Sequence, residues 1–265
     1  MKRKHNMQHR SGRVSVRTLL LACIGGFFVF LVNPLTAQDF YKQQLRYTRV
    51  REAHALKDSA LRADFREAGL PFPPSRMFLR VFKRDESVEV WVWSGNRYAL
   101  FRSYAICARS GGPGPKRRAG DMQIPEGIYR IARFNPTSQF LISMGIDYPN
   151  QSDRILGDRN NLGGDIYIHG NCVSIGCISV ADDDIREIYL LAARARSRGQ
   201  QSIPVHIFPT KMNEKPYAEL LEYMADQTEL LQFWENLKTI HDYFERNRTI
   251  PLISVDRSGR YRLRE

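Results

Sequence analysis

Three short runs of β-branched and aromatic residues follow one another between positions 77 and 101, and they limit the fold more than any other feature. The runs are Met77–Phe82, Val88–Trp93 and Tyr98–Phe101. Runs of this kind are typical of β-strands, and Ser94–Asn96 has the composition of a hairpin turn. The sequence therefore predicts consecutive antiparallel strands in this region.

The rest of the chain adds further strands and three helices. Apolar residues at helical spacing predict helices over Phe40–Glu67, Asp183–Arg198 and from Tyr217 to about Arg246. Short strands are expected at Ile128–Ile131, Ile166–Ile168 and Val205–Phe208, with a strand-like tail at the C-terminus. Strands and helices do not alternate as they do in βαβ units, so we expect an α+β fold with a predominantly antiparallel sheet.

The first forty residues have the order of a secretory signal. Six cations, ending with Arg17, are followed by the apolar run Thr18–Val32 and the small-residue stretch Leu35–Ala37. The run is shorter than the ~20 residues that span a bilayer, which favours a cleaved signal and a mature chain that starts near Gln38. An uncleaved membrane anchor is the alternative. Both interpretations predict an exported protein of the periplasm or cell envelope, with membrane contact only if the signal stays.

Composition excludes several classes of protein. Apolar residues make up 43% and charged residues 26%, which argues against a disordered chain or one with many membrane spans. The formal charge is +12, part of it in the signal, and the remaining excess suits an anionic partner or an ordinary solvated surface. We find no glycine-rich phosphate loop and no basic helix with interleaved aromatic residues, so neither a nucleotide nor a nucleic-acid partner is expected.

The cysteines point to a reactive thiol. Cys23 lies in the signal, which leaves Cys107, Cys172 and Cys177 in an oxidising compartment. Because three is an odd number, at least one thiol stays free, pairs with another chain or binds a ligand. Cys107 and Cys172 could pair and join two loops, or both could remain buried thiols.

Chemistry-bearing residues concentrate between Ile166 and Val180. A thiol needs a nearby base to become a nucleophile, and glycines could let the loop turn so that His169 reaches Cys177. Two other interpretations stay open at this point. The histidine and cysteines could be structural core residues, or His169, Cys172 and Cys177 could be three of the four ligands that zinc requires.

Short motifs that occur together between about Arg76 and Pro209 are shared with one known family. These motifs are His169-Gly170, Ser174-Ile175-Gly176-Cys177, Gly114-Pro115-Lys116-Arg117, Gly120-Asp121, Ile124–Tyr129, Phe134–Pro136 and Tyr148–Asn150. By these motifs the sequence resembles the L,D-transpeptidase catalytic domain (YkuD-like) family, and within it the YafK-like branch.

The resemblance implies a predominantly β catalytic domain and a thiol enzyme that acts on peptidoglycan stem peptides, in cell wall biogenesis and cell shape. It implies that Cys177 attacks the carbonyl of the third-position diamino acid while His169 takes and returns the proton. The backbone carbonyl of Ser174 would orient His169, and Gly176 and Cys177 would supply oxyanion donors. The acyl group would pass to an amine or to water. A wall-linked lipoprotein is a further candidate partner, and we expect neither a metal nor another cofactor.

Two positions depart from the main family. Ile175 stands where the family has a second histidine, and Ser179 stands where it usually has arginine. These changes keep three functions open: a transpeptidase, a hydrolase that trims stem peptides or releases wall-linked protein, and a peptidoglycan-binding module without activity.

Four further residues are candidate substrate contacts. Lys116 and Arg117 could bind a substrate carboxylate, or could simply be solvated. Tyr148 could line the cleft or only order its loop, and Gly170 adjoins the expected base.

We divide the chain into a signal or anchor over 1–37, an N-terminal helical segment over 38–75, the catalytic domain over 76–209 and a C-terminal helical extension over 210–265.

Overall fold

The structure is a computed structural model, and it describes residues 40–213 and 215–264. The predicted signal over residues 1–37 lies outside the described residues. Within them, no helix is both long enough and apolar enough to cross a membrane.

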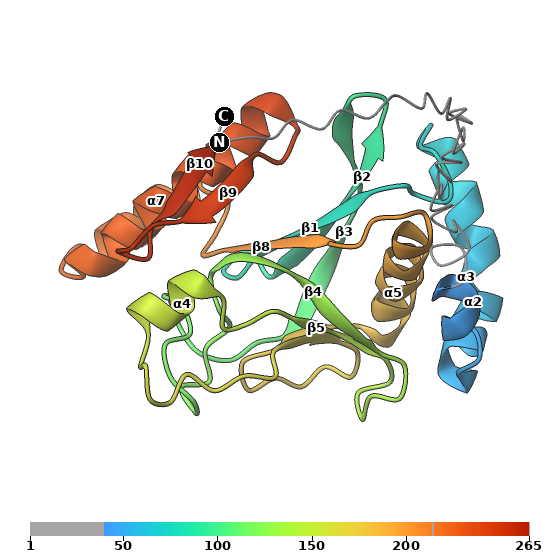
Figure 1. Cartoon of the computed structure of the whole chain (residues 1–265), viewed down its shortest axis with the longest axis horizontal. Helices are drawn as coiled ribbons and strands as arrows, with labels where there is room; N and C mark the ends of the chain where they lie inside the picture. Colours follow the sequence, from blue (N-terminus) through green and yellow to red (C-terminus); the bar gives the residue numbers. More distant parts are fainter. Residues whose placement is uncertain (1–39, 214, 265) are drawn as a thin grey trace, which may run out of the picture. The chain divides into compact units, whose positions relative to one another are not determined.

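Eight strands close into a barrel in the order β1-β2-β3-β7-β6-β5-β4-β8. Figure 1 labels β1 to β5 and β8 among them. Their bounds are Met77–Phe82 (β1), Ser87–Ser94 (β2), Arg97–Ala108 (β3), Gly127–Asn135 (β4), Ser143–Ile146 (β5), Tyr167–His169 (β6), Ile178–Val180 (β7) and Pro204–Phe208 (β8). Neighbouring strands are antiparallel except for β1 with β8 and β6 with β7. The predicted α+β class with a mainly antiparallel sheet is confirmed.

The predicted hairpin joins β2 to β3. Ser94 pairs with Arg97, and Gly95 between them has a φ of +62°, a conformation that glycine adopts without a steric penalty. Strand β3 extends well past the predicted end at Phe101, to Ala108. Its added part alternates between exposed and buried residues, as a strand with one face on the core does.

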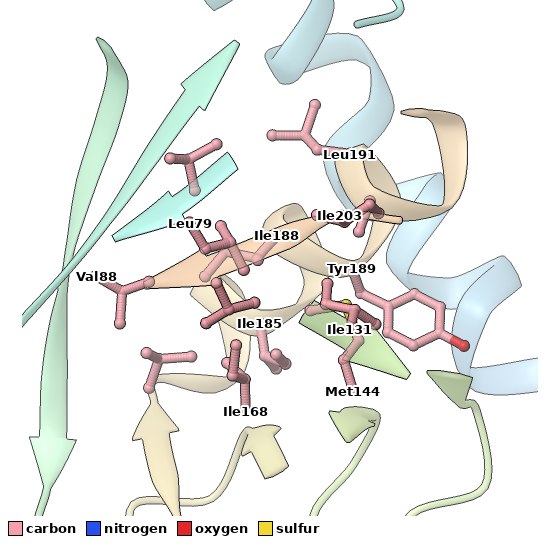
Figure 2. Packing of buried hydrophobic residues seen from close by; sticks show 14 of the residues in the cluster. Leu79, Val88, Ile131, Met144, Ile168, Ile185, Ile188, Tyr189, Leu191 and Ile203 are labelled. Carbon is pink, nitrogen blue, oxygen red and sulfur yellow. The ribbon is translucent and has the colours of Figure 1, made fainter. Parts of the chain in front are cut away.

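Helix α5 (Asp182–Ser197) packs against the barrel strands, and its buried residues share one apolar core with them. Its Ile185 and Ile188 are fully buried and belong to one apolar cluster with Leu79 of β1 and Ile168 of β6 (Figure 2). Helix α5 therefore packs against β6, the strand that carries the predicted base His169.

Two predicted helices are each broken into two. The N-terminal one consists of α2 (Phe40–Gln44) and α3 (Thr48–Glu67), and the C-terminal one of α6 (Lys215–Tyr223) and α7 (Thr228–Asn247). Neither break contains glycine or proline, so the sequence gives no local signal for it. At the first break Tyr47 is extended, with a ψ of 132°, and the Tyr41 N–H donates to Ser197 Oγ of α5 at 2.6 Å. Helix α2, on the N-terminal side of the break, is thus hydrogen-bonded to α5.

Three short elements are absent from the sequence prediction: β5, β7 and α4 (Gln151–Leu156). Each is six residues or shorter, too short for a periodic pattern to show. The strand-like C-terminal tail is a hairpin of β9 (Leu252–Val255) and β10 (Tyr261–Arg264).

A buried ion pair next to the barrel is hydrogen-bonded to helix α7 through a tryptophan. Lys83 Nζ lies 2.9 Å from Glu126 Oε1, and Trp234 Nε1 of α7 donates to Glu126 Oε2 at 2.6 Å. The same lysine donates to the carbonyl oxygens of Gly114 and Ile124, at 2.7 and 2.9 Å. The glycine- and proline-rich segment Gly111–Gly120, called the Gly/Pro loop below, borders the site. Lys83 holds this loop, and the partner of Lys83, Glu126, is bound by helix α7.

Candidate active site

The predicted nucleophile and base lie on two adjacent parallel strands. In the β6–β7 register Ile168 pairs with Ile178 and His169 with Ser179, so Cys177, just before β7, lies opposite Tyr167. Side chains alternate between the faces of a sheet, which places Cys177 and His169 on the same face. Both line one cavity of about 1050 Å³.

The His169 imidazole is buried and oriented by its neighbour. The ring is 1% exposed, and its Nδ1 lies 2.6 Å from the carbonyl oxygen of Gly170. A carbonyl can only accept, so Nδ1 carries the hydrogen and the neutral ring keeps its lone pair on Nε2. Burial lowers the pKa of His169, and the bond to Gly170 opposes this in part. The carbonyl in contact with the ring belongs to Gly170, whereas we predicted that of Ser174.

The Cys177 thiol is held by the backbone of the neighbouring strand. The Tyr167 N–H donates to Sγ at 3.4 Å, and Sγ lies 3.7 Å from the Asp165 carbonyl oxygen, which can accept its hydrogen. Burial raises the pKa of Cys177, the bond from Tyr167 lowers it, the nearby Asp165 charge raises it and Lys116 lowers it, in decreasing order of size. The direction of both pKa shifts favours a neutral thiol beside a neutral imidazole.

Ser174 organises the loop that leads into the cysteine. Its hydroxyl donates to the Cys177 carbonyl at 2.8 Å and accepts the Gly176 N–H at 3.2 Å. Gly176 has a φ of +126°, and a Cβ there would lie 3.1 Å from the Gln123 carbonyl oxygen, so only glycine fits without strain. Of the two predicted oxyanion donors, the Gly176 N–H is thus already engaged.

A disulfide joins Cys107 at the end of β3 to Cys172 in the same loop. Of the two alternatives that the sequence left open, this is the paired one. The bond removes Cys172 from any zinc site. Among the described residues no three His, Cys, Asp or Glu side chains are placed to hold a metal ion together. Cys177 is the free cysteine of the described chain.

The two predicted cationic contacts point in different directions. Lys116 lines the cavity but is 5% exposed, and its Nζ lies 2.7 Å from Asp121 Oδ1 and 2.8 Å from the Arg118 carbonyl. Arg117 lies outside the cavity lining. Its guanidinium packs 4.8 Å from the Phe233 ring of α7, and Nη1 lies 3.6 Å from Asp153 Oδ1. Lys116 and Arg117 are consecutive, and consecutive side chains of an extended segment point to opposite sides, which explains the separation.

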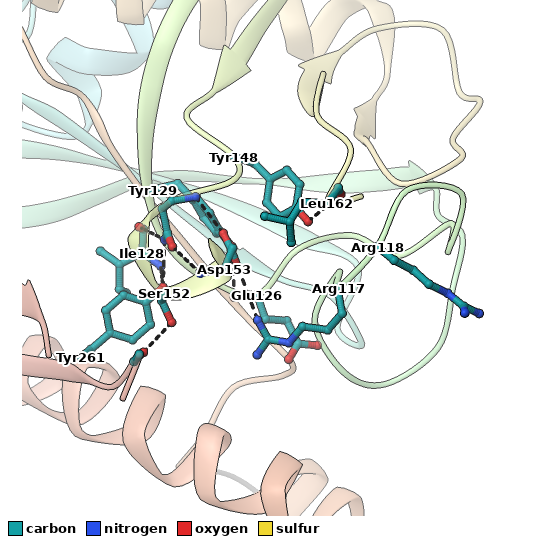
Figure 3. A network of polar contacts seen from close by, with 12 residues as sticks. Arg117, Arg118, Glu126, Ile128, Tyr129, Tyr148, Ser152, Asp153, Leu162 and Tyr261 are labelled. Carbon is teal, nitrogen blue, oxygen red and sulfur yellow. Dashed lines mark hydrogen bonds and ion pairs between the residues drawn. The ribbon is translucent and has the colours of Figure 1, made fainter. Parts of the chain in front are cut away.

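The other two predicted contacts also support the site from outside the cavity lining. The hydroxyl of buried Tyr148 donates to the Leu162 carbonyl at 3.1 Å (Figure 3). Gly170 is packed so closely that a Cβ would lie 2.6 Å from Asp182 Oδ1. Tyr148 therefore orders its loop, and Gly170 acts through its carbonyl on His169.

A polar network behind the cleft fixes the loop of Tyr148. Asp153 accepts from the hydroxyl of Tyr129, which lies 3.0 and 3.2 Å from its two carboxylate oxygens (Figure 3). Its Oδ2 also accepts the N–H of Asn150 at 3.0 Å. Burial raises the pKa of Asp153 to about 6. Asn150 in turn donates to the hydroxyl of Tyr261 in β10 at 2.9 Å. The C-terminal hairpin is thereby linked to the loops of the catalytic domain.

The two positions that depart from the main family have different surroundings. Ile175 is 79% exposed on the wall of the cavity, so the place of the family histidine is apolar and open to solvent. Ser179 is fully buried, and its hydroxyl donates to the Ala108 carbonyl at 2.6 Å. Its hydroxyl is therefore engaged away from the cavity, whose lining does not include Ser179.

Sequence reasoning missed the residues that hold the pair. Phe140 stacks on the His169 ring with centroids 4.6 Å apart, and Tyr167 acts through its backbone N–H. Asp165, whose backbone carbonyl lies near Cys177 Sγ, is at the cavity wall, and its Oδ1 lies 2.5 Å from Arg133 Nη2. An aromatic residue in a loop and a backbone donor leave no recognisable pattern in a single sequence.

Comparison with known proteins identifies the family of the chain. Residues 74–207 match the family model of the L,D-transpeptidase catalytic domain, YkuD. The chain is 38% identical over 189 residues to "Putative L,D-transpeptidase YafK" of Escherichia coli (strain K12), covering 71% of this chain and 73% of that protein.

Two solved structures are similar at low identity. The helical cell shape determining protein Pgp2 of Campylobacter jejuni overlaps with a TM-score of 0.40 at 17% identity, over 68% of this chain and 73% of that one. Bd1075 of Bdellovibrio bacteriovorus overlaps with a TM-score of 0.36 at 20% identity, over 63% and 59%. On the family match and the identity to YafK, the chain belongs to the L,D-transpeptidase catalytic domain (YkuD) family.

Proposed function

We propose that this chain is an exported, cysteine-dependent acyltransferase that acts on peptidoglycan stem peptides, with Cys177 as nucleophile and His169 as general base. The observation that carries the proposal is their placement on one face of two adjacent strands, at a shared cavity of about 1050 Å³. Membership of the family supplies the class of reaction and of substrate.

The first step forms an acyl-enzyme. Cys177 Sγ attacks the carbonyl carbon of the third-position diamino acid while its proton passes to His169 Nε2. The intermediate collapses, the C–N bond breaks, and Nε2 returns the proton to the leaving amine. Because burial raises the pKa of the thiol and lowers that of the imidazole, the proton moves as the C–S bond forms. The Tyr167 N–H stabilises charge that develops on sulfur, and the Cys177 N–H is the donor we assign to the oxyanion.

The second step passes the acyl group on. An amine attacks the thioester, His169 takes its proton, and the thiolate leaves and is reprotonated. Water can follow the same route, which gives hydrolysis. A transpeptidase therefore has to position the amine and limit the access of water.

Hydrolysis is the second candidate function because the cavity wall beside the nucleophile is apolar and offers few polar groups that could position an acceptor amine. Ile175 is exposed there, and the Ser179 hydroxyl is turned away to Ala108. Such a hydrolase would trim stem peptides or release wall-linked protein, for example a lipoprotein. A binding module without activity is the third candidate, and the ordered thiol, imidazole and Ser174 contacts count against it.

Mass spectrometry of reaction products tests the proposal. The purified mature chain is incubated with a disaccharide tetrapeptide, a peptidoglycan-linked protein fragment and an excess of free diamino acid or D-amino acid, with Cys177→Ala as the control. Exchange or dimer products that require Cys177 support transfer. Release of protein or amino acid without incorporation of amine leaves the hydrolase, and no Cys177-dependent product at all contradicts both enzyme functions.

A further inference from the structure

One arginine of the N-terminal helical segment contacts a loop of the active site. Arg49 lies in α3, outside residues 74–207 that match the catalytic domain family. Its Nη1 donates to the carbonyl oxygens of both Ser138 and Leu141, the latter at 2.8 Å. A single guanidinium thus spans the loop that joins β4 to β5.

This loop has a conformation that needs outside support. Leu141 has a φ of +68°, which is unfavourable for a residue with a branched side chain. Strained backbone persists only where the surroundings hold it. The Ser138 hydroxyl accepts the Phe140 N–H at 3.1 Å, and Arg49 binds the carbonyls on either side of Phe140.

The supported residue lies directly on the catalytic imidazole. The Phe140 and His169 rings are stacked at 29°, with centroids 4.6 Å apart. The Phe140 carbonyl oxygen is 3.4 Å from where a Cβ on Gly170 would lie, so the loop also packs against the residue that orients Nδ1. Phe140 and His169 both line the catalytic cavity.

We propose that Arg49 is a positioning residue for His169, and that it acts by holding the Phe140 loop against the imidazole. The proposal rests on the proposed function in that it takes His169 as the base. The N-terminal segment then completes the active site: α3 holds the loop, the loop holds one face of the ring, and Gly170 holds its Nδ1. Arg49 touches neither the substrate nor the reacting atoms.

The surface position of Arg49 makes a clean test possible. Arg49 is exposed, so Arg49→Ala leaves no buried charge and is expected to fold. Arg51 is a matched control on the same helix, since its guanidinium bonds to Arg46, Leu45 and Thr48 beside it, not to the Phe140 loop. Arg49→Lys can keep one of the two hydrogen bonds.

The experiment compares these variants by kinetics and by proton NMR of the His169 ring, assigned with His169→Asn. An aromatic ring stacked on the imidazole shifts its ring protons upfield. Arg49→Ala is expected to move them downfield and to lower kcat/KM by about 10- to 100-fold, mainly through kcat, because small displacements of a catalytic group have effects of this size. Arg49→Lys should recover part of both, and Arg51→Ala should change neither.

A double-mutant cycle with Phe140→Leu tests the route. If Arg49 acts through Phe140, the combined variant loses no more activity than Phe140→Leu alone. Additive losses, or unchanged ring shifts in Arg49→Ala, overturn the proposal. Should Arg49→Ala not fold, Arg49→Lys and Phe140→Leu carry the same comparison.

The NMR measurement also separates this proposal from the proposed function, because it needs no turnover. If the wild-type chain has no activity but shows the Arg49-dependent shift, the proposed function is refuted, whereas the positioning of the His169 ring by Arg49 is supported.

Discussion

The backbone N–H of Tyr167 donates to the Sγ of Cys177 at 3.4 Å. Tyr167 begins the three-residue strand that His169 ends, so one strand positions both the proposed nucleophile and the proposed base. The distance between the Cys177 and His169 side chains therefore depends on the β6–β7 pairing, and not on a flexible loop alone. Substitutions that disturb this pairing should affect activity even where they leave both side chains in place.

Replacing the nucleophile should abolish turnover. Cys177→Ala removes the only described thiol that lines the cavity, so we expect no acyl-enzyme and no product. A thiol-directed carbapenem, as the family membership implies, should add its mass to the wild-type chain at Cys177 and not to the variant. Product analysis and intact mass measure the two effects, and wild-type activity in Cys177→Ala would refute the mechanism.

The pH dependence of kcat/KM should show a base with a lowered pKa. His169 must be neutral to accept the thiol proton, so the rate falls only when the pH drops through its pKa, which burial places below the ordinary 6.5. Burial raises the pKa of Cys177 above its ordinary 9.0, so alkylation of the resting enzyme by iodoacetamide should accelerate mainly above that pH. Rapid alkylation that titrates below pH 7 would instead indicate a preformed thiolate–imidazolium pair.

Removing the disulfide should weaken the fold but leave some activity. Cys107 and Cys172 close a loop with a sequence separation of 65, so the double variant to Ala should lose about 2–4 kcal/mol of unfolding free energy. Cys177 and His169 remain, so turnover falls without disappearing. Thiol counting on the unfolded, unreduced mature chain is expected to find one thiol, and three after reduction; three before reduction would show that the bond does not form.

The sequence was informative where a pattern is local. Strands around the Gly95 turn follow from alternation and turn composition. The residue types and spacing around Cys177 were specific enough to predict a nucleophile and a base, and the structure brings these two residues to one cavity. The pairing of Cys107 with Cys172 was among the alternatives that the sequence left open, and the structure shows the paired one.

What the sequence missed depends on contacts between distant segments. The parallel pairing of β1 with β8 joins residues more than a hundred positions apart, and closure of the barrel rests on it. Lys116 and Arg117 are equivalent in the sequence, and only the packing of Phe233 under the Arg117 guanidinium shows which one leaves the cleft. The contact of Arg49 with the Phe140 loop is of the same kind, since it joins residues 92 positions apart.

The buried charge pair behind the Gly/Pro loop should be important for stability. Glu126 is fully buried between Lys83 and Trp234, so Glu126→Gln leaves the lysine charge without a partner carboxylate. Loss of one member of a buried pair typically lowers the unfolding free energy by about 3–5 kcal/mol. Denaturant unfolding measures it, with Glu219→Gln as the control, because that carboxylate is half-exposed in its pairs with Arg84 and Lys215 and should contribute under about 1 kcal/mol.

The same pair should affect catalysis through the loop. Lys83 also binds the carbonyls of Gly114 and Ile124, and the Gln123 carbonyl next to Ile124 packs on Gly176, beside the nucleophile. Glu126→Gln should therefore lower kcat at temperatures where the variant is still folded, whereas Glu219→Gln should not. If Glu126→Gln is destabilised but keeps the wild-type kcat, the pair stabilises helix α7 without supporting the catalytic loop.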